Sequence, residues 1–111
     1  MPQLTIRGIE PGTVATIVVP LVEELAIVCE CGTDNFTLDF LPVTTVSVSN
    51  GQLADTYPFI EVAWFERGQA VRDRFAEAVA RHLRLGGVYE VETAFKVYAE
   101  NAYYVNGEPC G

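Results

Sequence analysis

Residues 58–65 read Pro58-Phe59-Ile60-Glu61-Val62-Ala63-Trp64-Phe65, and this nearly continuous apolar run decides the fold. A run of this length and composition predicts a β-strand that is buried on both faces. An apolar stripe at helical spacing follows over residues 69–85, and Gly86-Gly87 supplies a stop signal. Residues 88–97 again predict a strand. A strand, a helix and a further strand in this order form a β-α-β unit whose two strands lie parallel.

The first half of the chain shows the same order of elements. Alternating residues predict a strand over residues 3–8. Across residues 14–28 the apolar side chains recur at intervals of three and four, which predicts a helix. Pro11 suits the first turn of this helix, and Pro20 lies inside it and should bend it. Gly32 is expected to end it.

The segment between the two halves is rich in β-branched and aromatic residues. This composition predicts a strand over residues 36–48. Pro42 has no amide proton to donate, so the middle of this strand is expected to lie at a sheet edge or to contain a bulge. Residues 49–51, Ser-Asn-Gly, predict a turn. Near the end of the chain, residues 103–107 predict a short strand or hairpin.

These elements predict one domain, residues 1–111, with a two-layer α+β fold. A chain of 111 residues is long enough for one core between two layers but not for two cores. Two β-α-β units side by side give a four-stranded sheet with both helices on one face. The strands at 36–48 and 58–65 are apolar on both sides, so the open face of the sheet needs a cover. Another copy of the same sheet would supply it, and the sequence therefore predicts an oligomer.

The charge of the chain excludes some classes of partner. Fifteen acidic side chains oppose seven basic ones, for a net charge of -8, whereas phosphate binding needs clustered cations. We therefore expect neither nucleic acid nor a membrane as a partner. The longest apolar stretch, residues 14–22, is too short to span a bilayer and has no basic segment before it, which predicts a cytoplasmic protein. Five arginines between residues 67 and 84 predict a solvated helix face paired with nearby acids, and a partner-docking stripe is the alternative.

Cysteine and histidine do not form a metal-binding pattern. The odd number of cysteines, Cys29, Cys31 and Cys110, does not suit a disulfide framework. Only one residue separates Cys29 from Cys31, which is closer than the ligand pairs of zinc sites. His82, the only histidine, borders the apolar stripe of the second predicted helix and is expected to pack there. We predict no metal and no cofactor.

Pro2 follows Met1 and opens the first predicted strand. Removal of Met1 would make the Pro2 nitrogen a free secondary amine. The ordinary pKa of an α-amino group is near ~8, and burial in an apolar pocket lowers it because the charged form is disfavoured. A base whose pKa is close to the ambient pH is suited to proton transfer. Retention of Met1 would instead leave this nitrogen as an amide with no basic lone pair.

Over essentially its whole length, the chain resembles the tautomerase superfamily, which includes macrophage migration inhibitory factor, oxalocrotonate tautomerase and carboxymethyl-hydroxymuconate isomerase. Residues 59–74 and 103–108 look closer still to a small bacterial branch without assigned activity. Only the Met-Pro start corresponds to the chemical motif of the superfamily. The resemblance rests on four stretches: MPQLTIRG at 1–8, CECGTDNFTLDFLPV at 29–43, FIEVAWFERGQAVRDRFAEAV at 59–79 and NAYYVNGEP at 101–109.

The resemblance implies a trimer of β-α-β-β-α-β protomers with Pro2 at the base of a pocket shared by adjacent subunits. The proline amine would act as general base and interconvert the keto and enol forms of a small enol or α-keto acid, an isomerase reaction. Such a site needs donors where the oxyanion grows. Amides near Gly68, at the start of the second helix, could add to them. The candidate substrate-binding side chains are two arginines, two apolar residues and two tyrosines: Arg7, Arg67, Trp64, Phe65, Tyr103 and Tyr104.

Each candidate also has a plainer interpretation. Arg67 could pair with Glu66, the two apolar residues could belong to the core of the trimer, and the tyrosines could lie in a packed strand.

Members that isomerise dicarboxylates carry an arginine early in the first helix and another in the second strand. Residues 11–16 and 37–40 contain no cation here, Asp39 would repel an anion if it faced the pocket, and residues 33–34 replace the lysine of migration inhibitory factor. The alternative function is therefore a catalytically silent trimeric protein with a binding or structural role on this scaffold, and a ferredoxin-like monomer is a third alternative.

Overall fold

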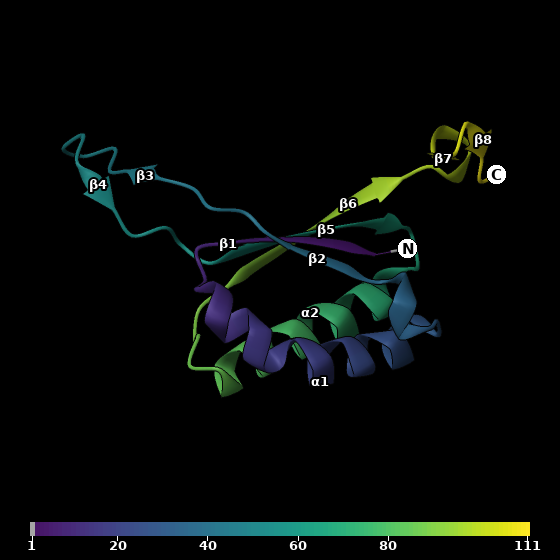
Figure 1. Cartoon of the computed structure of the whole chain (residues 1–111), viewed down its shortest axis with the longest axis horizontal. Coiled ribbons are helices and arrows are strands. Elements are labelled where there is room, and N and C mark those ends of the chain that lie inside the picture. Colours follow the sequence, from purple (N-terminus) through teal and green to yellow (C-terminus); the bar gives the residue numbers. More distant parts are fainter. Residues whose placement is uncertain (1) are drawn as a thin grey trace.

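Two long helices pack on one face of a four-stranded sheet in the computed structural model (Figure 1). The structure describes residues 2–111, so Met1, and with it the question of its removal, lies outside the described residues. The sheet and helices, residues 2–40 and 58–98, are termed the body. Its elements are β1 (Gln3–Arg7), α1 (Pro11–Cys29), a 3₁₀ turn η1 (Thr33–Asn35), β2 (Thr37–Phe40), β5 (Phe59–Phe65), α2 (Gln69–Leu85) and β6 (Glu92–Tyr98).

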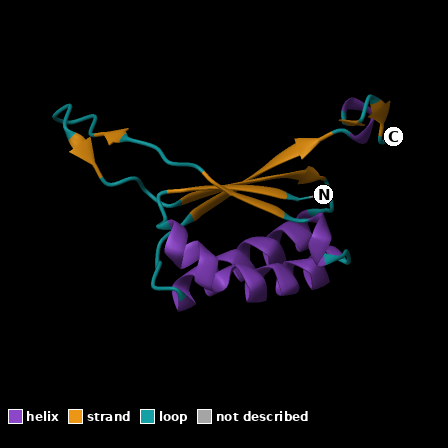
Figure 2. Ribbon diagram, viewed as in Figure 1, coloured by secondary structure: helices purple, strands orange, loops and turns teal. Residues whose placement is uncertain are grey.

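The strands pair in the order β2-β1-β5-β6. Within each half the two strands are parallel, and the halves meet through the antiparallel pair β1–β5. Figure 2 shows both helices on the same side of this sheet. The predicted β-α-β-β-α-β order is therefore confirmed, and the second helix has the predicted bounds.

The core lies between the helices and one face of the sheet. Trp64 is 1% exposed and packs edge-on against Phe75, with ring centroids 5.5 Å apart. Phe95 of β6 completes this aromatic contact at 4.7 Å from the Trp64 ring. Burying one such side chain contributes about 1.5–3 kcal/mol, so the set is sufficient to hold the two layers together. Other buried members are Leu4, Ile6, Ile17, Leu21, Leu25, Ile60, Val62, Val79 and Leu83.

α1 begins at Pro11 as predicted but ends at Cys29, before the expected Gly32. Glu30 takes the left-handed conformation at φ 54°, and the Cys31 amide donates to the Ala26 carbonyl at 3.0 Å. This is a helix cap that glycine usually provides, and glutamate at that position gives no sequence signal.

By length and composition alone, α1 would be able to cross a membrane, with a mean hydropathy of 1.8 over its apolar window. A third of that window (33%) is buried inside the protein. Its buried side chains, among them Ile17, Leu21 and Leu25, pack against the sheet. The structure therefore uses α1 as the core helix of a two-layer fold.

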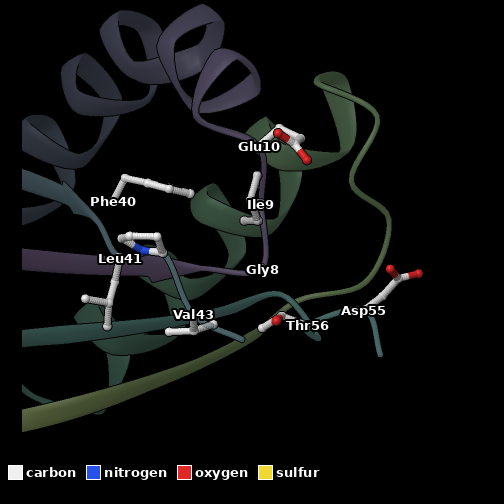
Figure 3. Close-up of a pocket in the computed structure, with 9 residues that line it drawn as sticks. Gly8, Ile9, Glu10, Phe40, Leu41, Val43, Asp55 and Thr56 are labelled. Atoms are coloured by element: carbon white, nitrogen blue, oxygen red, sulfur yellow. The ribbon is translucent and has the colours of Figure 1, made fainter. Parts of the chain in front are cut away.

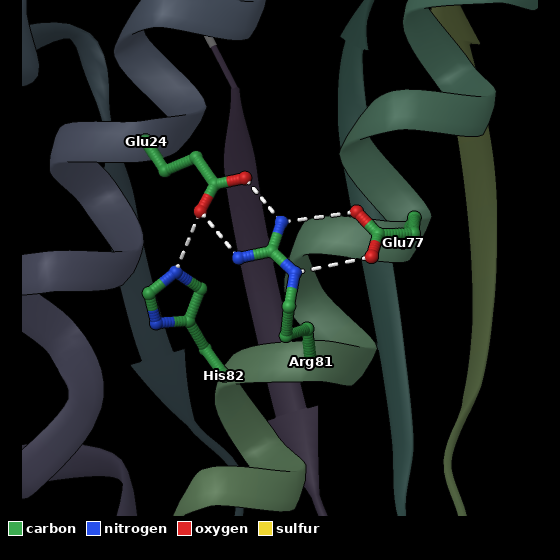
Figure 4. A network of polar contacts seen from close by, with 4 residues as sticks. All are labelled: Glu24, Glu77, Arg81 and His82. Atoms are coloured by element: carbon green, nitrogen blue, oxygen red, sulfur yellow. Dashed lines mark hydrogen bonds and ion pairs between the residues drawn. The ribbon is translucent and has the colours of Figure 1, made fainter.

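A polar network joins the two helices (Figure 4). Arg81 of α2 donates to Glu24 of α1 at 2.9 Å through Nη1 and to Glu77 at 3.1 Å through Nε. His82 Nε2 lies 2.9 Å from Glu24 Oε1, and this histidine is 8% exposed. The Arg81 hydrogen bonds first, and His82 second, lower the pKa of Glu24 to about 2. The predicted packing of His82 and the predicted pairing of Arg81 with acids are confirmed.

The face of the sheet that lies away from the helices is mixed rather than apolar. Thr5 stands opposite Glu61 on one side and beside Asp39 on the other. The prediction that the strands at 36–48 and 58–65 are apolar on both faces is therefore wrong for Thr37–Phe40, whereas this face of β5 is apolar at Phe59, Ala63 and Phe65 and acidic only at Glu61. Only four residues of the first segment, Thr37–Phe40, join the sheet, because the chain leaves it before Pro42. The apolar residues that follow, from Leu41 onward, lie outside the sheet.

Residues 41–57, termed the arm, extend away from the body (Figure 1). The arm carries the two-residue strands β3 (Thr45–Val46) and β4 (Leu53–Ala54), which pair antiparallel. It exposes large apolar side chains, including Leu53 at 78% and Val46 at 54%. The arm therefore places on the surface the apolar residues that the sequence suggested for the sheet.

Residues 99–111, termed the tail, leave the body beyond β6 at the other end of the molecule (Figure 1). The tail contains a 3₁₀ turn, η2 (Glu100–Ala102), and the predicted hairpin, β7 (Tyr104–Val105) with β8 (Glu108–Pro109). Arm and tail stretch the molecule to 47 × 29 × 25 Å. Its radius of gyration is 15.3 Å, against about 13 Å for a compact domain of this length.

Candidate active site

Pro2 lies immediately before β1, and its side chain is less than 2% exposed. Its carbonyl oxygen accepts a hydrogen bond from the Thr37 amide at 3.2 Å. Gln3 stands opposite Ala63 in the neighbouring strand, so this end of β1 meets the carboxyl end of β5. The loop from β5 to α2 and the last residues of β6 lie at the same end of the sheet. Of the predicted site residues, Arg67 is in this loop, Phe65 ends β5 directly before it, and Tyr103 follows β6 in the tail.

Three aromatic side chains gather at this end of the sheet. The Tyr103 ring stands edge-on to Phe65, at 5.1 Å between centroids, and lies 5.6 Å from Tyr98. Gln3 Nε2 donates a hydrogen bond to the Tyr103 hydroxyl oxygen at 3.1 Å. Phe65, Tyr98 and Tyr103 are termed the aromatic cluster. It joins β5, β6 and the tail to the residue that follows Pro2.

Arg67 lies just beyond β5. Its Nη1 donates to the Phe65 carbonyl oxygen at 3.0 Å, and its guanidinium carbon lies 5.1 Å from the centre of the Trp64 ring. Glu66 does not bind this guanidinium; its carboxylate forms an ion pair with Arg72 at 2.8 Å. The suggested Arg67–Glu66 side-chain pair is therefore absent from the described residues. Backbone and aromatic contacts hold the guanidinium instead.

The amides before α2 are already occupied. The Arg67 and Gly68 N–H groups donate to Glu66 Oε1, at 3.0 and 3.2 Å. The carboxylate of Glu66 thus neutralises the positive end of the helix dipole. The prediction that amides near Gly68 add donors for a substrate finds no support in this geometry.

The other predicted residues lie farther from Pro2 or face another way. Trp64 points into the helix-covered core, and the Arg67 guanidinium lies over its ring. Arg7 ends β1 at the opposite end of the sheet, where its guanidinium carbon lies 4.8 Å from the centre of the Phe59 ring. Tyr104 is 61% exposed in the tail. Within this protomer, Phe65 contacts both Arg67 and Tyr103 at the end of the sheet where Pro2 lies, whereas Arg7 is at the opposite end and Tyr104 is exposed in the tail.

Two residues at this end were not anticipated from the sequence, Gln3 and Tyr98. Alternation in β1 would have placed Gln3 on the open face, but its partner is 100 residues away in the chain. Tyr98 pairs in register with Phe65, and that register follows from the parallel β5–β6 pairing. Long-range pairing of this kind leaves no local pattern in the sequence.

Cys29 lies at the end of α1 and is also electrostatically coupled to this region. Burial raises the pKa of its thiol, and the charge of Arg67 opposes that shift. The thiol stays protonated near neutral pH, so it is a packing residue rather than a nucleophile.

A hollow of about 380 Å³ lies at the base of the arm (Figure 3). Figure 3 shows Phe40, Leu41 and Val43 along one part of its lining and the carboxylates of Glu10 and Asp55 along another. These carboxylates would repel an anion, and the hollow is at the Arg7 end of the sheet, away from Pro2. Across residues 2–111 no group of three or more His, Cys, Asp or Glu side chains is placed to hold a metal ion.

The family of the chain is decided by its match to a family model. The model described as "Domain of unknown function (DUF1904)" matches residues 1–109. The chain belongs to the DUF1904 family. A solved DUF1904 domain from Sebaldella termitidis ATCC 33386 is 32% identical, covers 98% of this chain and 99% of its own, and superposes with a TM-score of 0.88. Among curated proteins, none matches the sequence.

More distant solved structures share the fold. The wild-type asymmetric trimer of F6 fused 4-OT is 13% identical, covers 97% of this chain and 95% of its own, and gives a TM-score of 0.78. A macrophage migration inhibitory factor-like protein from Entamoeba histolytica is 12% identical, covers 97% of each chain and gives 0.68. At these identities the likeness shows the fold alone. It confirms that this DUF1904 chain has the tautomerase superfamily fold.

Proposed function

We propose that this DUF1904 protein is a tautomerase-like isomerase in which the Pro2 nitrogen, after removal of Met1, is the general base. The observation that carries the proposal is the position of Pro2, whose side chain is less than 2% exposed and which lies one residue from the contact with the aromatic cluster. The shared fold of 4-OT and the migration inhibitory factor-like protein supports it.

The substrate is a small enol or α-keto acid. The amine of Pro2 takes a proton from the carbon next to the carbonyl, the electron pair of that C–H bond forms a C=C bond, and the π pair of the carbonyl moves onto its oxygen. The resulting ammonium group then returns the proton to a different atom of the enolate. Burial disfavours the ammonium form, which lowers the pKa of the amine toward neutral pH, where a base of this kind works well.

Arg67 is the proposed anchor for the carboxylate of the substrate. A guanidinium has five N–H donors, and one of them serves the Phe65 carbonyl here. Phe65 and Trp64 provide the apolar surroundings, and the Tyr103 hydroxyl is the proposed donor to the oxyanion. Neither residues 11–16 nor residues 37–40 contain a cation, so one carboxylate is a better match than two.

The proposed working unit is a cytoplasmic homotrimer without a nucleic-acid or membrane partner. The exposed apolar side chains of the arm support assembly. Arg7 and Tyr104 lie away from Pro2 in their own protomer, so their contribution to substrate binding would come from an adjacent subunit.

A catalytically silent trimer with a binding or structural role is the second candidate. The occupied amides before α2 favour it, because Glu66 already accepts hydrogen bonds from the Arg67 and Gly68 amides. The absence of the two arginines of the dicarboxylate isomerases favours it as well.

Turnover of phenylpyruvate separates the two candidates. The proposal expects saturable enol–keto conversion that falls by about 10²-fold or more in Pro2→Ala and is lost when the N-terminus is acetylated. Pro11→Ala, at an exposed position in the first turn of α1, is the matched control and should retain activity. Equal turnover by Pro2→Ala and the native chain would exclude Pro2 as the base. No turnover of any enolisable ketone by the native chain would favour the silent trimer.

A further inference from the structure

The tail is attached to the body mainly through one side chain. Of residues 99–111, Tyr103 alone is half-buried, and the others are exposed. The short elements of the tail contact chiefly one another. The position of the whole segment relative to the sheet therefore depends on the contacts of Tyr103.

The backbone of Tyr103 couples its side chain to the rest of the tail. Its N–H donates to the Glu100 carbonyl at 3.2 Å, and its carbonyl accepts from the Cys110 amide at 2.9 Å. These bonds span the 3₁₀ turn η2 on one side and the β7–β8 hairpin on the other. A displacement of Tyr103 would consequently weaken both bonds, so the protection of the Cys110 amide reports on the position of this residue.

The contacts that hold that side chain include two ring contacts and a directional hydrogen bond. The Phe65 and Tyr98 rings provide apolar area at 5.1 and 5.6 Å, which tolerates sliding. The hydrogen bond from Gln3 Nε2 to the Tyr103 hydroxyl, at 3.1 Å, fixes the position of the ring. It is partly buried, so water competes with it less than at an open surface.

Gln3 is also the residue that follows Pro2 in β1. Its backbone is fixed by pairing with Thr37 on one side and Ala63 on the other. The directional contact of the tail is therefore made to the rigid strand that carries the proposed base, one residue away from it.

We propose that Gln3 is a positioning residue: through Tyr103 it holds the aromatic cluster and the tail against the Pro2 end of the sheet, and so forms one wall of the substrate site. This inference rests on the proposed function for its catalytic consequence. The wall itself depends only on the Gln3–Tyr103 contact. Loss of that contact should weaken substrate binding while the proline base remains intact.

Three variants test this inference: Gln3→Leu removes the amide at similar size, Tyr103→Phe removes the hydroxyl and keeps the ring, and the double variant combines them. Gln52→Leu in the arm and Tyr89→Phe, both at exposed positions, are the matched controls. The first readout is hydrogen exchange of the tail amides, above all the Cys110 amide bonded to Tyr103. The second is the division of the effect between KM and kcat for phenylpyruvate.

We expect faster exchange of the Cys110 amide in both single variants by about five- to tenfold, the effect of losing one hydrogen bond, and no further increase in the double variant. KM should rise by a similar factor while kcat and its pH dependence change little. Unchanged exchange in Gln3→Leu, or faster exchange with unchanged KM, would overturn the inference. Absence of turnover in the native chain would overturn the proposed function instead, and exchange alone would then decide whether Gln3 holds the tail.

Discussion

The body and the arm of this protein differ in how far they bury their apolar residues. In the body, helix and sheet cover each other, and Trp64, Phe75 and Val62 are at most 1% exposed. In the arm no residue is fully buried, and Leu53 remains 78% exposed on a strand of two residues. An isolated two-stranded hairpin is marginally stable in water. The body therefore encodes its own structure, whereas the arm has the composition of a segment that needs a partner.

The tail repeats this contrast on a smaller scale. Tyr104 and Val105 are 61% and 49% exposed, and one tyrosine anchors the segment. Arm and tail lie at opposite ends of the sheet (Figure 1). Each end of the body thus has one weakly attached extension, and the tail is the one beside Pro2.

The largest expected loss of unfolding free energy comes from a substitution in the core of the body. Phe75→Ala removes a ring that is 0% exposed and touches both Trp64 and Phe95, so it leaves a cavity between the layers. Unfolding in urea should show a loss of about 3–5 kcal/mol. A loss below about 1 kcal/mol would mean that the layers are not held by this core.

The next effect is at the joint between body and arm. Gly8 has φ +78°, and a Cβ there would lie 2.5 Å from the Tyr57 carbonyl oxygen, where the arm returns to the body. Gly8→Ala should cost about 2 kcal/mol or more, from left-handed strain and this clash. Gly12→Ala is the control, because an added Cβ meets nothing within 4 Å and the residue is helical. Equal stability of the two variants in thermal unfolding would contradict the close approach.

A smaller effect on stability is expected from the polar network that joins the two helices through Glu24. The pKa of Glu24 is lowered in the folded protein from 4.5 to about 2, so its contribution to stability is present above pH 4.5 and is lost as the pH falls toward 2. Glu24→Gln should cost about 1 kcal/mol at pH 7, a value reduced for solvent exposure, and the difference from the native chain should shrink below pH 4. Urea titrations at several pH values measure this, with the exposed neighbour substitution Glu23→Gln as control. A difference that stays constant down to pH 2 would exclude the carboxylate as its cause.

The smallest effect on the protomer, and the sharpest test of the contrast, is in the arm. Leu53→Asp should change the unfolding free energy of the isolated protomer by less than about 0.5 kcal/mol, because the side chain contacts little there. It should nevertheless abolish assembly in sedimentation velocity. Val19→Asp, on the outer side of α1 at 64% exposure, is the control and should leave assembly intact. If Val19→Asp disrupts assembly and Leu53→Asp does not, the contact surface is on the helices.

The same contrast explains what could be predicted from sequence. Residues 69–85 form a helix with the expected bounds because its apolar stripe and its glycine stop are local signals. The prediction of one strand over residues 36–48 was wrong beyond Phe40, because β-branched residues predict an extended chain but do not indicate which sheet it joins. The site itself stays a prediction: Phe65 and Arg67 could be chosen because the strand at 58–65 is a local signal, whereas the contacts of Gln3 and Tyr98 depend on pairing between distant segments.

The measurement that tests the account most directly is the intact mass of the protein from its natural host. We predict a mass that is short by the Met1 residue, with an unmodified Pro2 nitrogen that serves as the base. A mass that includes Met1, or any acyl group on that nitrogen, would contradict the proposed chemistry and leave the fold without its base.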